Sequence, residues 1–509
     1  MSLSYQPVSH EETSSSSASL SQDPSSTAPI IRTGQHTAEG EAEAIELELL
    51  TQSGKHQSTH PSPSLRIHHA VALLVGLMVG SGLFASSGPI FLGTASPHLA
   101  LGVWVISGGL AWMGALCYAE LGASLPQDGG EVVYLTRAFG PGVAFLFEWV
   151  SILIVRPAGS AITLRVFEDH VVDYFHTPST RPYISISALA FLTLIHVVSV
   201  RAGQGALLTM MALKILLLLL ISLSGLLVYL NWISPDIDSL GLQDEPIPSP
   251  NLSSIVLAIY AGLWAFDGWN AVNVVSGQLR NPGRDLPRSI HISLPLLLGL
   301  YLCMNLAYFT ILPPQAFSSP TLVALLARAI CGTAGATFLL IAVTISTLGS
   351  TLASLYTGAH LVRSSALTCH LPQALAYLHP QWGTPVTALL VQAIPIALLL
   401  IASSASMSLE PLLSLCGITA WLFYASCTFA LLLLRHRLPS LPRPYMAPLP
   451  AILLFLTLAL LLLLASLITD PFFSSLTLVV LALGWATWTW IISPRLGSRS
   501  RSVNEDLLS

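Results

Sequence analysis

Charged residues are scarce in this 509-residue chain, and their scarcity excludes an ordinary water-soluble domain. Asp, Glu, Lys and Arg together account for 9 % of the residues, whereas soluble domains contain roughly a quarter. Hydrophobic residues account for 53 %, and the mean hydropathy is +0.71. This composition predicts an all-α polytopic membrane protein, because helices satisfy their own backbone hydrogen bonds within a bilayer.

Motifs of catalysis and of metal binding are absent as well. The chain contains no G-x-S-x-G elbow, no H-E-x-x-H pair and no Walker loop, which are typical of hydrolases, zinc enzymes and nucleotide-driven pumps. Its six cysteines form no C-x-x-C pair and have no spacing typical of a metal site. We therefore expect no enzymatic activity, no cofactor, no metal and no nucleic-acid partner.

The apolar residues fall into twelve stretches that we interpret as membrane spans. They run near 67–95, 99–123, 132–164, 183–199, 206–232, 254–277, 289–312, 326–362, 384–403, 409–434, 449–468 and 474–493. Residues 1–64 precede them and are rich in Ser, Thr and acidic residues, which predicts a disordered cytosolic tail. The remainder divides into a core of ten spans at 65–440, spans 11 and 12 at 441–494, and a short tail at 495–509.

The distribution of arginine predicts the orientation in the membrane. A cytosolic N-terminus places thirteen arginines on the cytosolic side and leaves only Arg165, Arg181 and Arg328 near the outer face. This asymmetry follows the positive-inside rule. An even number of spans then returns the C-terminal tail to the cytosol.

Two of the apolar stretches are interrupted. Gly80-Ser81-Gly82 breaks the first span, and Ala265–Trp269 breaks the sixth. Unwound backbone at membrane depth is tolerated where it lines a cavity or meets a ligand. The helix after the first break aims its N-terminal amides at the gap, which suits a carboxylate. Breaks at matching positions of two halves predict a transporter built on a 5+5 inverted repeat of spans 1–5 and 6–10.

A few intramembrane charges are candidates for function. Lys214 lies ~12 Å into the fifth span, where it either donates to carbonyls freed by a broken helix or replaces a coupling Na⁺. Asp267, inside the second break, either receives a cationic group of the substrate or pairs internally. Trp264 beside it is either a gate or ordinary packing. For Glu120 and Arg156 we expect structural pairing.

Several strings in spans 1 to 10 together resemble a known family. They are Gly80-Ser81-Gly82-Leu83-Phe84, the segments 114–122 and 129–131, Ile154-Val155-Arg156-Pro157, the segment 262–270, and Asn281-Pro282 followed by Leu286-Pro287. The chain is similar here to the amino acid–polyamine–organocation superfamily, and within it to the L-type amino acid transporter group. That resemblance covers residues 68–440. It implies a LeuT-like fold with broken helices 1 and 6 and Na⁺-independent transport of amino acids, commonly by exchange. Separately, we expect the plasma membrane rather than an internal membrane.

The resemblance also implies roles for single residues. Gly80, Ser81 and Gly82 would hold the substrate carboxylate, and Trp264 would be the aromatic gate. Lys214 would stand in for sodium, with Ser346 close to it. Around Asp267 and Gly268, the sixth-span motif most resembles the subtype that exchanges neutral and cationic amino acids.

The chain also departs from that family, and alternatives remain open. Residues 165–183 contain no cysteine, so a disulfide-linked heavy chain is not expected. The segment after the eighth span reads Ser364–His370 instead of containing Arg-Glu-Gly-His, so the cytosolic gate is expected to differ. The alternatives are an amino-acid sensor with the same fold, a large-neutral or methionine-type permease, and a membrane scaffold.

Overall fold

Helices make up the regular structure of the residues that the structure describes. The structure is a computed structural model that describes residues 65–177, 182–237, 240, 249–319, 322–332, 334–404, 410–469 and 471–496. These residues belong to one unit, Pro61–Ser509. The predicted tail at 1–64 and residues 497–509 of the predicted C-terminal tail lie outside the described residues.

Nine helical segments in the described ranges are long and apolar enough to cross a membrane. They are built from α4 (Pro97–Ser124), α6 (Pro141–Val150) with α7 (Arg156–Phe175), α9 (Val200–Tyr229), α11 (Pro282–Ile311), α13 (Ala334–Leu367), α14 (Val386–Ser404), α15 (Glu410–Arg437), α16 (Leu449–Thr469) and α17 (Pro471–Thr487). Three expected spans are not among them. Two are the interrupted segments and the third is α8 (Tyr183–Val198), of 16 residues. The all-helical multi-pass architecture is confirmed, whereas the number of twelve spans stays a prediction.

Both predicted interruptions are present. Helix α2 (Ile67–Met78) ends before Val79 and Gly80, and α3 (Ser81–Thr94) begins directly after them. The break therefore lies slightly earlier than predicted, since Ser81 and Gly82 already belong to α3. Helix α10 (Leu252–Ala265) is followed by a turn, and the chain continues as the 3₁₀ helix η4 (Ala271–Gln278).

The two interrupted segments run antiparallel. Ser86 Oγ of α3 donates to the carbonyl oxygen of Ala261 at 2.8 Å, and Ser254 Oγ of α10 donates to that of Gly93 at 2.7 Å. As the numbering rises along α3, the contacts therefore move back along α10.

The same direction holds on the other side of the breaks. A Cβ atom added at Gly268 would lie 2.9 Å from Leu77 Cβ at the end of α2, and Leu65 N donates to Gln278 O at 3.0 Å. The breaks thus face each other in the middle of an antiparallel pair. This arrangement agrees with the first and sixth spans of an inverted repeat, although the complete 5+5 repeat stays a prediction.

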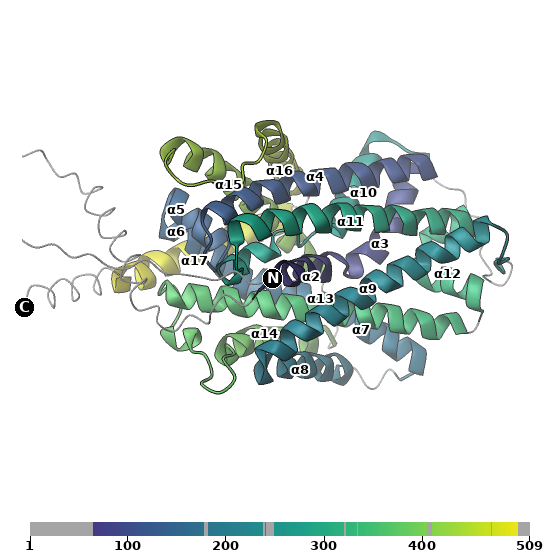
Figure 1. Ribbon diagram of the computed structural model, residues 1–509, viewed down its shortest axis with the longest axis horizontal. Helices are drawn as coiled ribbons and strands as arrows, with labels where there is room; N and C mark the ends of the chain where they lie inside the picture. Colours follow the sequence, from purple (N-terminus) through teal and green to yellow (C-terminus); the bar gives the residue numbers. More distant parts are fainter. Residues whose placement is uncertain are drawn as a thin grey trace, which may run out of the picture. The chain divides into compact units, whose positions relative to one another are not determined.

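Other helices enclose the first interrupted segment. Helix α2 packs against α9, α11 and α13, and α3 packs against α10 (Figure 1). Helices α4 and α11 also pack against each other (Figure 1). Helix α2 and the break at its C-terminal end are therefore covered by several helices, and most α2 residues are buried.

The expected third and eighth spans need correction. The third does not begin as one helix, because α5 (Glu131–Phe139) ends at Gly140, with φ of +90°, and α6 starts anew at Pro141. One π-helical turn, η1 (Ser151–Val155), then joins α6 to α7. The eighth is divided into α12 (Leu322–Cys331) and α13 around Gly332, with φ of +55°. Glycine readily adopts these positive φ values, which end a helix. The sequence stays apolar on both sides of such a glycine, so composition does not reveal the end of the helix.

Candidate functional site

The N-terminal end of α3 has no side-chain cap, and Gly80 and Gly82 there are partly buried. Its N-cap residue is Gly80, and no side chain caps the helix, so the first amides of α3 lack the partners that a cap would supply. A Cβ atom added at Gly82 would lie 3.5 Å from the carbonyl oxygen of Trp264 and 3.7 Å from its indole ring. Trp264 is 42 % exposed. The Ser81 side chain lies outside what the structure describes.

Lys214 contacts the end of the preceding half-helix. From α9, its Nζ donates to the carbonyl oxygens of Gly76 and Val79, both at 2.6 Å, and to Ser350 Oγ at 2.8 Å. The side chain is fully buried. Carbonyls at a helix end have no intrahelical donor, so the ammonium group occupies the position where the broken helix leaves backbone oxygens unpaired.

Two serines of α13 complete this cluster. Ser346 Oγ donates to Val79 O at 3.1 Å, and Ser350 Oγ donates to Gly76 O at 2.9 Å. A Cβ atom added at Gly349 would lie 2.7 Å from Lys214 Cε, so this glycine provides space for the lysine. Ser346 was expected from the family resemblance, whereas Ser350 was not. Their spacing of four residues, which places both on one helical face, was the signal that could have identified it.

Tyr301 of α11 connects the two breaks and was not anticipated. Its hydroxyl lies 3.0 Å from the carbonyl oxygen of Met78 and 3.4 Å from that of Ala265. These are the last residues of α2 and α10. The ring is fully buried, so one side chain holds both helix ends at a fixed separation. Nothing in the local sequence distinguishes this tyrosine from others in the apolar spans.

Asp267 is exposed within the second break and is hydrogen-bonded to a neutral group. The hydroxyl of Tyr424 in α15 donates to its Oδ1 at 2.8 Å, and the Tyr424 ring lies 4.9 Å from that of Trp269. No ion pair of Asp267 occurs among the described residues. In the described part of the chain, Asp267 therefore does not pair internally with a basic side chain.

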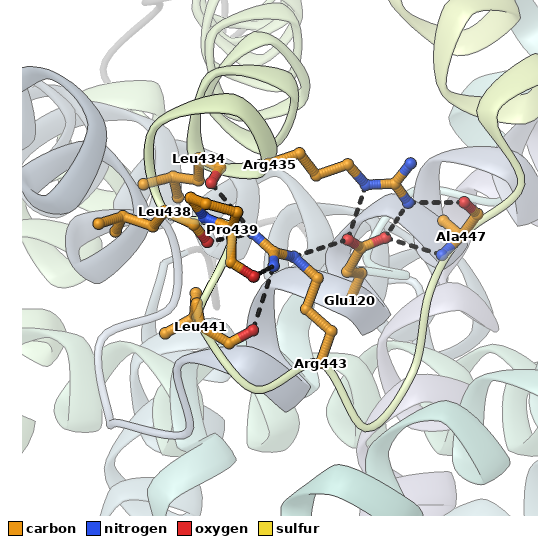
Figure 2. Close-up of polar contacts among 8 residues, drawn as sticks. All are labelled: Glu120, Leu434, Arg435, Leu438, Pro439, Leu441, Arg443 and Ala447. Atoms are coloured by element: carbon orange, nitrogen blue, oxygen red, sulfur yellow. Dashed lines mark hydrogen bonds and ion pairs between the residues drawn. The ribbon is translucent and has the colours of Figure 1, made fainter.

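Glu120 forms the structural pairing that its position predicted. Its fully buried carboxylate accepts hydrogen bonds from Arg435 through both Nε and Nη2 and from the backbone N–H of Ala447, and Arg443 Nε lies 3.6 Å away (Figure 2). Arg156, by contrast, donates to the Thr357 hydroxyl at 3.0 Å. The Glu120 cluster therefore ties α4 to the connection between α15 and α16.

The groups around the two breaks are charged side chains and backbone donors and acceptors that the helices leave unpaired. The described residues include no group of three or more His, Cys, Asp or Glu side chains that could hold a metal. They do bring together two facing breaks, an uncapped helix N-terminus, a buried ammonium group and an accessible carboxylate. In an integral multi-pass membrane protein, helices broken at mid-membrane are the sites where secondary transporters hold their substrates.

Comparison with known proteins agrees with this class. A sequence model of the family described as "Amino acid permease" matches residues 65–493. The chain belongs to the amino acid permease family.

Similar proteins have names that specify substrates. The chain is 32 % identical over 436 residues to the b(0,+)-type amino acid transporter 1 of Mus musculus, covering 83 % of this chain and 86 % of that protein. The human protein of the same name is 30 % identical over 432 residues, covering 82 % of this chain and 86 % of its own length. The large neutral amino acids transporter small subunit 2 of Mus musculus is 31 % identical over 425 residues, covering 82 % and 78 %.

Proposed function

We propose that this protein is a Na⁺-independent exchanger of neutral and cationic L-amino acids that works by alternating access. We place it in the plasma membrane. The arginine distribution favours an orientation with both termini in the cytosol. Membership of the amino acid permease family and the names of the b(0,+)-type relatives support the substrate class.

The contacts of Lys214 are the observation that carries the proposal. In sodium-coupled transporters with broken helices, carbonyls freed by a break coordinate the ion. Here an ammonium group reaches two such carbonyls at 2.6 Å, and two serine hydroxyls donate to the same carbonyls. An ammonium group held at this position by three acceptors would make a bound Na⁺ unnecessary.

The substrate is placed by charge complementarity. Its carboxylate would meet the first amides of α3 at Gly80, Ser81 and Gly82, where the helix dipole favours an anion. Trp264 would close over the bound molecule. The side chain of the substrate would then extend along the second break toward Asp267 and Gly268.

Asp267 favours a substrate range that includes cationic amino acids. The alternative, a permease for large neutral amino acids, is supported by relatives of similar sequence identity. It gives no role, however, to the Asp267 carboxylate, which has no basic partner within the described chain. If a substrate cation supplies that partner, arginine should compete with leucine for uptake.

The test is uptake by purified protein in liposomes with labelled arginine and leucine. Uptake should persist when choline replaces Na⁺. Asp267→Asn should weaken arginine transport about tenfold to hundredfold, since a hydrogen bond to a charged group is worth about 1.5–3 kcal/mol. Leucine transport should change much less.

The matched control is Asp169→Asn, the same chemical change at a half-exposed position in α7. Asp169→Asn should leave the transport of both arginine and leucine unchanged. An equal loss of arginine and leucine in Asp267→Asn would make that residue structural, and failure of arginine to compete in the wild type would favour the large-neutral alternative. Binding without any flux would identify a sensor.

The absence of cysteine at 165–183 supports a protein without a disulfide-linked heavy chain. We expect a single band for the membrane-extracted protein on a non-reducing gel, unchanged by reductant. A larger band that collapses on reduction would contradict this. Replacing Cys331, an exposed cysteine at the end of α12, would then show whether the bond forms there.

A further inference from the structure

Glu131 differs from the other buried carboxylates of the described residues. Glu120, Glu148, Glu168 and Asp285 each have an arginine or histidine nitrogen within ion-pair distance. Glu131, at the start of α5, is 2 % exposed and forms no ion pair within the described part of the chain. Its environment therefore provides no basic side chain in direct contact with the ionised form.

The carboxyl group of Glu131 is also only partly hydrogen-bonded. Asn270, just beyond the second break, donates from Nδ2 to Oε1. The other oxygen, Oε2, is buried without any hydrogen-bond partner. A buried carboxylate oxygen without a partner is costly as an anion and is stabilised when the group takes up a proton.

The charged and titratable groups around Glu131 leave an excess of negative charge. Those that interact with it electrostatically are Asp267 in the second break, Arg156 at the start of α7, Tyr118 in α4, Tyr134 in α5, and Tyr424 and Cys427 in α15. The tyrosines and the cysteine are neutral in this setting. This neighbourhood therefore holds two carboxyl groups and one guanidinium group, and Arg156 also donates to the Thr357 hydroxyl at 3.0 Å.

We propose that Glu131 is a proton-binding site coupled to the substrate site at Asp267. The cluster carries one proton on Glu131 when no cation lies at Asp267, and a cationic substrate side chain displaces that proton to water. The proton belongs on Glu131, since Asp267 is accessible and accepts a hydrogen bond from Tyr424 whereas Glu131 is buried with one bare oxygen. A neutral amino acid then crosses together with a proton, and a cationic one crosses without it.

This inference rests on the proposed exchange of neutral and cationic substrates and adds the proton to it. Exchange of external leucine for internal arginine becomes electroneutral, because the proton that enters with leucine balances the charge that leaves with arginine. Without the proton, the same exchange moves one net charge and must respond to the membrane potential.

The experiment uses the full-length protein in liposomes that contain a pH-sensitive dye, with potentials set by K⁺ and valinomycin. External leucine against internal arginine should acidify the lumen, by roughly one proton per leucine, and external arginine against internal leucine should make it alkaline. Leucine against leucine is the internal control and should leave the pH unchanged. The rate of leucine–arginine exchange should be the same at positive and negative potentials.

Glu131→Gln should keep the exchange but abolish the pH signal and make the rate depend on potential. The matched control is Glu168→Gln, a buried carboxylate in α7 that pairs with Arg165, which should behave like the wild type. Wild-type exchange without a pH change, or an unchanged pH signal in Glu131→Gln, would overturn the proton site. Should Glu131→Gln not fold, the wild-type comparison of the three exchange modes still decides. No exchange of arginine for leucine at all would instead refute the proposed function.

Discussion

Single residues at the breaks act through backbone atoms that the helices themselves leave unpaired. Lys214 illustrates this, since two of its three contacts are to carbonyl oxygens of α2 and the following residue. Tyr301 similarly reaches only carbonyls, those of Met78 and Ala265. The geometry of the proposed substrate site therefore depends on side chains that need not touch the substrate.

Lys214→Ala tests this dependence on the unpaired carbonyls. Removing the ammonium leaves the Gly76 and Val79 carbonyls with serine hydroxyls alone, and hydrogen bonds from a charged donor are worth about 1.5–3 kcal/mol. We expect transport to fall at least about tenfold while the protein still reaches the membrane. Initial rates of leucine uptake in liposomes, normalised to incorporated protein, provide the measurement.

The chain offers a matched control, because Lys55 is its only other lysine. Lys55→Ala should transport like the wild type. Wild-type flux in Lys214→Ala would show that the lysine is merely accommodated in α9.

The sequence predicted part of this site and could not predict the rest. Lys214 was identifiable because an ammonium group in an apolar span requires acceptors. Tyr301 is an apolar-span tyrosine among several, and its acceptor Met78 is 223 residues away. Glu131 was noted only as part of a family string, since its lack of a counterion appears only when neighbouring helices are in place.

At the scale of elements, the two breaks form one structural unit. Gly268 has φ of +101° and lies against the end of α2, where an added Cβ would come within 2.9 Å of Leu77 Cβ. Both the conformation and the close approach favour glycine here. The second break can therefore approach the first only because its backbone carries no side chain at this point.

Gly268→Ala should disturb both breaks together. Backbone strain at such a φ costs about 1–3 kcal/mol, and the contact with Leu77 adds to it. We expect transport of leucine and arginine to fall together, with a lower melting temperature of the purified protein in detergent. Gly383→Ala is the control for strain alone, since Gly383 has φ of +64° with nothing within 4 Å of an added Cβ. Equal effects of the two substitutions would contradict a specific contact between the breaks.

The positions of the breaks were predictable, whereas the division of two other spans was not. Gly80-Ser81-Gly82 and the polar Asp267 interrupt otherwise apolar stretches, so composition and local conformation change together. Gly140 and Gly332 lie within apolar surroundings, where hydropathy continues across a change of helix direction. Length and hydropathy alone therefore merge α12 with α13 and α5 with α6.

In the molecule as a whole, polar contacts gather at the end where the arginine distribution predicts the cytosol. Gln278 lies at the end of η4. Its Nε2 is 2.7 Å from His360 Nδ1 in α13 and donates to Asp128 Oδ2 at 3.1 Å, and its Oε1 accepts a hydrogen bond from the Tyr356 hydroxyl at 3.0 Å. Alternating access, as proposed, requires these contacts to separate. The Glu120 cluster belongs to the surrounding frame, because it joins α4 to the segment that connects α15 with α16.

The last prediction therefore concerns stability. Glu120→Gln keeps the shape of the side chain but leaves Arg435 and Arg443, both largely buried, without a carboxylate. Removing one partner of a buried ion pair costs roughly 3 kcal/mol or more, so the melting temperature of the purified protein should fall clearly. Asp169→Asn, which affects a half-exposed pair, should change it little. Arg435→Gln combined with Glu120→Gln should destabilise less than the sum of the two single changes, because each single change already breaks the same pair. Strictly additive losses would mean that Glu120 and Arg435 stabilise the protein independently, and the frame would then not depend on this contact.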